Sequence, residues 1–142
     1  MLEYNKILVP VDFSEISRLS IRKAMSCRNS HVGQLILIHV VDYAPPPYVA
    51  SDLPAAYSSE QPIIERARKH LIGLSDELNA GSTEIVVRSG QAKIELVNYV
   101  QEQDIDLVVM AAHSNSALEK LLGSTTSSVV QKVDCDVLVI HG

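Results

Sequence analysis

The chain has 142 residues, of which 46% are hydrophobic and 20% charged, and its formal net charge is −5. This length and composition predict a single domain over residues 1–142 with one hydrophobic core, and exclude a disordered chain. The acidic charge and the scattered Lys and Arg residues exclude nucleic-acid binding as the main activity. The apolar runs are too short to span a membrane, and no signal region opens the chain, so we expect a cytoplasmic protein.

The chain opens with a predicted strand, a turn and a helix. Residues 6–11 are an Ile, Leu and Val run that ends at Pro10, and residues 12–14 offer side chains that could cap a helix. The apolar spacing continues this helix through Met25. An almost unbroken apolar run over residues 35–41 then predicts a strand that is covered on both faces.

The middle of the chain predicts a long loop, an amphipathic helix and a short strand. The loop spans residues 43–59, is rich in Pro, Ala, Ser and Tyr, and is expected to be the most mobile segment. Apolar residues at steps of three and four over residues 63–78 mark a helix that Gly81 can close. Residues 84–88 form a brief strand that ends at Gly90.

The last third of the chain continues the alternation of strands and helices. The expected elements are a helix over residues 94–100, a buried strand over residues 105–112, a Ser/Thr-rich helix over residues 123–132 and a strand over residues 137–140. Strands that alternate with helices predict an α/β fold with a parallel sheet, because right-handed crossovers place helices on both faces.

The predicted sheet also indicates where a ligand would bind. Open parallel sheets bind ligands beyond the carboxyl ends of their strands, where the strand order reverses. The free N–H groups at the start of the last helix, and the hydroxyls beside them, favour an anion. The residues at these places are Pro10, Asp12, Ala111, His113, Ser114, Gly123, Ser124 and Thr125. They predict a phosphorylated ligand, although Ser and Thr also cap helices without binding anything.

Two of the candidate side chains have more than one interpretation. Asp12 could hold a divalent metal or a ribose, or it could cap the first helix. His39 and His113 end the second and fourth strands, but no third metal ligand stands at a useful spacing, so we predict no metal site. Cys27 and Cys135 are too few for a disulfide framework and are expected to be reduced and mostly buried.

Catalytic motifs are missing from the sequence. It contains neither the glycine pattern of P-loop NTPases nor that of Rossmann dehydrogenases. None of the serines lies in a G-x-S-x-G motif. We therefore predict no catalytic residues and no enzyme activity.

Six segments of the chain carry a family resemblance. They are KILVPVDFS at residues 6–14, LILIHVVD at 35–42, DIDLVVM at 104–110, His113, LGS at 122–124 and CDVLVI at 135–140. In this order they resemble the universal stress protein family over nearly every element. The resemblance implies a five-stranded parallel sheet in the order 3-2-1-4-5 and a regulatory role in stress survival. It also implies homodimers that pair their last strands, here Val137, Leu138, Val139 and Ile140.

The resemblance gives two answers about nucleotide binding. In the ATP-binding members, two glycines stand where this chain has Ala111 and Ser114, and a final Gly-[ST] pair matches Gly123 and Ser124. The interval between Ser114 and Gly123 is also one residue shorter than in the ATP-binding members. In this respect the chain resembles the UspA-type branch, for which ATP binding is not known. By family analogy, Pro10, Asp12 and Val40 would line the adenosine side.

The resemblance therefore implies a cytoplasmic, homodimeric stress-response protein that acts by binding a protein partner or a small ligand. The alternative is a switch that binds an adenine nucleotide, ATP or AMP with magnesium, and hydrolyses it slowly at most. In that case Asp12 would contact the metal, and the helix that starts at Gly123 and Ser124 would contact the phosphate.

Overall fold

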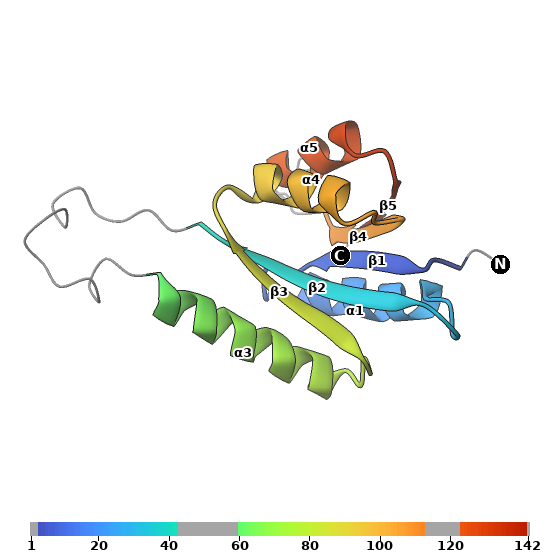
Figure 1. Cartoon of the computed structure of the whole chain (residues 1–142), viewed down its shortest axis with the longest axis horizontal. Coiled ribbons are helices and arrows are strands. Elements are labelled where there is room, and N and C mark those ends of the chain that lie inside the picture. Colours follow the sequence, from blue (N-terminus) through green and yellow to red (C-terminus); the bar gives the residue numbers. More distant parts are fainter. Residues whose placement is uncertain (1–2, 43–59, 113–122, 142) are drawn as a thin grey trace, which may run out of the picture.

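The computed structural model describes residues 3–42, 60–112 and 123–141. In these ranges the chain alternates between parallel strands and helices (Figure 1). The elements are β1 (Lys6–Pro10), α1 (Glu15–Cys27), β2 (Gln34–Val41), α3 (Gln61–Glu77), β3 (Thr83–Ser89), α4 (Ala92–Glu102), β4 (Leu107–Ala111), α5 (Ser124–Lys132) and β5 (Asp136–Ile140). The sheet order is β3-β2-β1-β4-β5, which confirms the predicted α/β fold and its 3-2-1-4-5 order.

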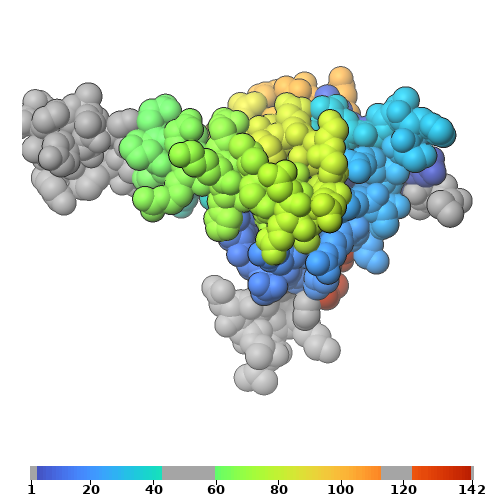
Figure 2. All heavy atoms as spheres, turned by 90° about the horizontal axis from the view of Figure 1, so that it is seen from below, coloured from blue at the N-terminus to red at the C-terminus, as the bar shows by residue number. Residues whose placement is uncertain are grey.

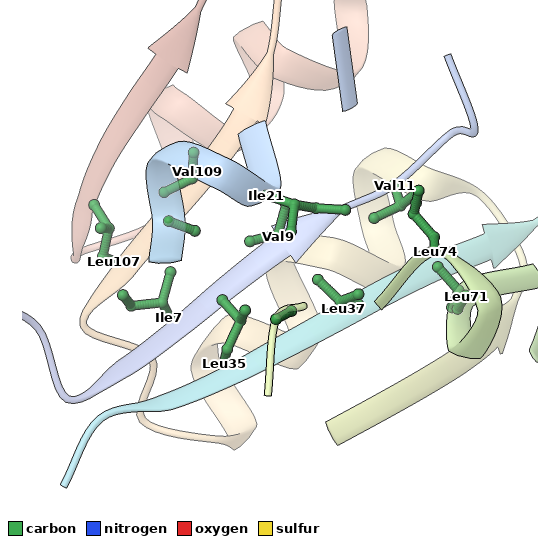
Figure 3. Close-up of a cluster of buried hydrophobic side chains, with 12 residues drawn as sticks. Ile7, Val9, Val11, Ile21, Leu35, Leu37, Leu71, Leu74, Leu107 and Val109 are labelled. Atoms are coloured by element: carbon green, nitrogen blue, oxygen red, sulfur yellow. The ribbon is translucent and has the colours of Figure 1, made fainter. Parts of the chain in front are cut away.

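Helices cover both faces of the sheet. Figure 1 shows α1 and α3 on one face and α4 and α5 on the other. Successive side chains of a strand point to opposite faces, so each apolar run contributes to two cores. On the α1/α3 face, Ile7, Val9, Leu35 and Leu37 of the central strands pack with Ile21, Leu71 and Leu74 of the helices (Figure 3). On the α4/α5 face, Leu8, Ile36, Ile38 and Val108 pack with Leu96, Val100 and Val129.

The strand and helix types follow the sequence prediction, but two apolar positions do not. Ile63 of α3 and Ile94 of α4 were expected on buried helix faces, yet 43% and 48% of their surfaces are exposed. Each is the third residue of its helix, and the buried residues begin four residues later in α3, at Ala67, and two residues later in α4, at Leu96. In each helix the apolar pattern therefore begins before the buried residues do.

The expectation for the two cysteines can also be compared with the structure. Cys27 and Cys135 are unpaired thiols, as predicted, but both are only partly buried, which corrects the expectation of mostly buried side chains. The loop at 43–59, with His113 and Ser114, lies outside the described residues. Within the residues described, no helix is both long enough and apolar enough to cross a membrane.

Candidate functional site

The strand order reverses between β1 and β4. From β1 the chain continues to β2 on one side of the sheet, and β4 lies on the other side. The paired residues of β1 and β2 continue to Pro10 and Ile38, whereas those of β1 and β4 end at Leu8 and Val108. The carboxyl ends of β1 and β4 therefore lie beyond their shared pairs, where ligands bind in open parallel sheets.

The turn that follows β1 is organised by one carboxylate oxygen. Oδ1 of Asp12 accepts hydrogen bonds from the Ser14 amide at 3.1 Å, the Ser14 hydroxyl at 2.6 Å and the Ser17 hydroxyl at 2.7 Å. A side chain that bonds the amide two residues ahead forms an Asx turn. Ser14 is the N-cap of α1, but its side chain makes no capping bond to the helix, which corrects the expected capping role. We call residues 11–14 the Asp12 turn.

The end of β2 presents different side chains to the two faces of the sheet. Val40 is partly buried and packs against the core on the α4/α5 face. The neighbouring His39 faces the other way, and its Nδ1 lies 2.7 Å from the carbonyl oxygen of Val11. Because a carbonyl only accepts hydrogen bonds, Nδ1 carries the proton in this contact. His39 therefore belongs to the scaffold of the Asp12 turn, and Val40 to the opposite side.

A buried hydroxyl joins α5 to the end of β4. The Thr126 hydroxyl donates to the Ala111 carbonyl at 3.0 Å, and only 3% of Thr126 is exposed. The Ala112 amide donates to Ile140 of β5, so the Ala111 carbonyl, one residue earlier, points away from β5. Thr126 directly follows the predicted site residues Ser124 and Thr125, but its hydroxyl is engaged in this internal contact.

The first turn of α5 offers an environment suited to an anion. Gly123 is its N-cap with φ −61° and ψ 161°, and the first turn contains no acidic residue. Ser124 is exposed and Thr125 partly exposed. Because the first amides of a helix have no partner within it, they attract negative charge.

We use the name strand-end site for the predicted residues that lie at this end of the sheet. They are Pro10, Asp12, Val40, Ala111, Gly123, Ser124 and Thr125. The structure places them on three neighbouring strands and on the start of α5. In the described part of the chain, no group of three His, Cys, Asp or Glu side chains could hold a metal ion.

A cavity of about 420 Å³ lies at the other end of the sheet, before β4 and β5. Its lining includes Asp104, Ile105, Asp134 and Cys135. Burial raises the pKa of the Cys135 thiol, which favours the protonated and less nucleophilic form. This thiol is therefore not an activated nucleophile.

The comparisons with known proteins point to one family along nearly the whole chain. A sequence model described as the universal stress protein family matches residues 3–141. Universal stress protein A homolog 2 of Coxiella burnetii is 30% identical over 142 residues, which cover 99% of this chain and 97% of that protein. The structure of MJ0577 from Methanocaldococcus jannaschii matches with a TM-score of 0.79 and 25% identity, over 99% of this chain and 98% of that one. UspA from Lactobacillus plantarum matches with a TM-score of 0.73 and 27% identity, over 99% of both chains.

Proposed function

Because this chain belongs to the universal stress protein family, we propose that it is a regulatory protein that acts by binding a ligand at the strand-end site. We further propose that the ligand is an adenine nucleotide. The observation that carries this proposal is the hydrogen bond from Thr126 to Ala111, which holds the start of α5 against the end of β4. Since β4 is the neighbour of β1, a phosphate at α5 would lie at the same end of the sheet as Asp12.

Each part of the ligand has a matching group in the strand-end site. The first amides of α5, with the hydroxyls of the exposed Ser124 and the partly exposed Thr125, suit a phosphate. The carboxylate of Asp12 is exposed and oriented by three hydrogen bonds, which suits a ribose hydroxyl or a magnesium ion that accompanies the phosphate. Val40 and Pro10 present apolar surface at the ends of β2 and β1 for the base.

Proteins with this fold are known to hold adenine nucleotides. One universal stress protein was solved in complex with cAMP, and its chain matches with a TM-score of 0.70 and 21% identity. Another, from Archaeoglobus fulgidus, was solved in complex with dAMP and matches with a TM-score of 0.64 and 17% identity. At these identities the likeness extends to the fold alone, so the case for this chain depends on its own residues.

Binding without catalysis fits the serines of the Asp12 turn. The hydroxyls of Ser14 and Ser17 both donate to Asp12, so the carboxylate shapes the turn. The nitrogen Nδ1 of His39 is engaged by the Val11 carbonyl. A serine nucleophile needs a base that takes its proton, whereas the hydrogen bonds of these two hydroxyls to Asp12 fix the shape of the turn.

Equilibrium titration of the purified protein with ATP and with AMP, each with and without magnesium, tests this function. We expect saturable binding that Gly123→Val weakens, because the new side chain would enter the path of the phosphate. The backbone of Gly123 is extended with a negative φ, a conformation that valine adopts without backbone strain. Ser124→Ala should also weaken binding, since it removes an exposed hydroxyl from the same turn.

The control is Ser82→Ala, which changes an exposed serine before β3, at the opposite end of the sheet. It should leave the dissociation constant unchanged. Equal affinity in wild type, Gly123→Val and Ser124→Ala would remove the strand-end site from consideration.

A further inference from the structure

The conformation of Phe13, at the centre of the Asp12 turn, requires an explanation. Its φ is 66°, in the left-handed region that bulky side chains rarely adopt. Such a residue persists only where surrounding contacts hold it, and strained residues gather at sites that bind or switch. Phe13 directly follows Asp12, so its conformation helps to set the direction of the carboxylate in the strand-end site.

Two histidines from other elements hold the Phe13 ring. His70 of α3 stacks on it with a centroid distance of 4.0 Å and an interplanar angle of 1°. His39 of β2 lies at 4.6 Å and 41°, and its Nδ1 contacts the Val11 carbonyl in the same turn. The turn is thus fixed by its own carboxylate on one side and by rings from α3 and β2 on the other.

The contact with His70 differs from ordinary core packing. His70 is exposed, whereas the neighbouring Leu71 is fully buried against the sheet. The core of this face is therefore formed without the imidazole, which stacks on Phe13 instead. The nearly parallel rings indicate a specific stack, and an aromatic pair of this kind contributes beyond the area that it buries.

A second contact connects the same two parts of the molecule. Figure 2 looks onto the face covered by α1 and α3 and shows the two helices side by side. Nη1 of Arg18 in α1 lies 2.8 Å from a carboxylate oxygen of Glu77 in α3. His70 and Glu77 are two helical turns apart and so share one side of α3. Helix α3 therefore contacts the Asp12 turn at His70 and the body of α1 at Glu77.

We propose that the stack of His70 on Phe13 is a positioning contact by which helix α3 holds the Asp12 turn in its ligand-binding shape. The inference extends the proposed function, because it states what controls the geometry of the same site. His70 and Phe13 are positioning residues that act through Asp12. When the stack is lost, the strained Phe13 conformation loses a support, and the turn opens more often.

The test compares His70→Ala with His70→Phe, with Lys69→Ala as the control on the adjacent exposed position. Amide hydrogen exchange of residues 14–17 is measured without ligand, because the Ser17 amide reports on the turn through its bond to the Ser14 carbonyl. In His70→Ala the exchange rates should rise by about three- to tenfold, the effect expected from one aromatic pair. His70→Phe restores the stacked ring and should return the rates to wild type, as should Lys69→Ala.

ATP with magnesium is then titrated into the same four proteins. Affinity should fall by a similar factor in His70→Ala and recover in His70→Phe. Unchanged exchange in His70→Ala, or exchange in His70→Phe as fast as in His70→Ala, would overturn the positioning role. The expected exchange pattern in proteins that bind no nucleotide would support the contact and overturn the nucleotide proposal instead.

Discussion

At the scale of single residues, the strand-end site depends on polar atoms that form hydrogen bonds within the protein. Oδ1 of Asp12 collects three hydrogen bonds, and the Thr126 hydroxyl satisfies the Ala111 carbonyl. The residue that bonds the Ala111 carbonyl cannot be identified from the local sequence. Thr126 is one of several hydroxyl residues in a row, and only the packing of α5 on β4 determines which of them turns inward.

Thr126→Val should destabilise the protein, because the methyl group fills the space of the hydroxyl but leaves the Ala111 carbonyl without a donor. The expected loss in the free energy of unfolding is about 1–3 kcal/mol, the cost of an unsatisfied buried group. Thr125→Val is the matched control, since Thr125 is partly exposed, and it should cost about 0.5 kcal/mol or less. Urea unfolding gives both values. Equal losses for the two substitutions would show that the buried bond from Thr126 to Ala111 does not stabilise the protein.

At the scale of elements, the strands could be predicted because buried parallel strands are almost continuously apolar. Residues 35–41 read as a strand, and β2 is Gln34–Val41. The helices were located by periodicity, yet periodicity overstated how much of each helix is buried, as Ile63 and Ile94 show. The strained φ of Phe13 and its stack with His70 could not be predicted. They arise from a contact between residues far apart in sequence, and neither residue carries a local signal for it.

Adjacent residues of α3 give a direct test of how this helix packs. Leu71 is fully buried against the sheet, and 44% of Ile72 is exposed. Leu71→Ala should lower the free energy of unfolding by about 2–5 kcal/mol, because it removes apolar surface that is buried on folding and leaves a cavity. Ile72→Ala should change it by about 0.5 kcal/mol or less. Similar losses for both would mean that α3 is rotated about its axis relative to this packing.

At the scale of the whole molecule, the two edges of the sheet differ. On the β3 edge, the Ile85 carbonyl points outward and accepts a hydrogen bond from Nη1 of Arg68 in α3 at 3.4 Å. On the β5 edge, the Ile140 carbonyl points to β4, so by alternation the backbone groups of Val137 and Val139 point outward. No described residue bonds them, and exposed edges invite pairing. We therefore propose a homodimer that pairs its β5 strands, with residues Val137–Ile140 at the interface.

Val139→Pro should prevent dimerisation, because it removes an outward donor and leaves the pairs of β4 with β5 in place. The matched control is Val87→Pro on the β3 edge, where the backbone groups also point outward. Light scattering should give a dimer for wild type and for Val87→Pro, and monomers or aggregates for Val139→Pro. A stable wild-type monomer at micromolar concentration would refute the proposed interface.

The central claim, that the strand-end site holds an adenine nucleotide, is tested most directly by native mass spectrometry of the protein as purified. We predict an added mass equal to one adenine nucleotide per chain, retained in Ser82→Ala and lost in Gly123→Val. If the wild-type chain carries no added mass, and none appears after ATP or AMP is supplied with magnesium at millimolar concentration, the claim is contradicted.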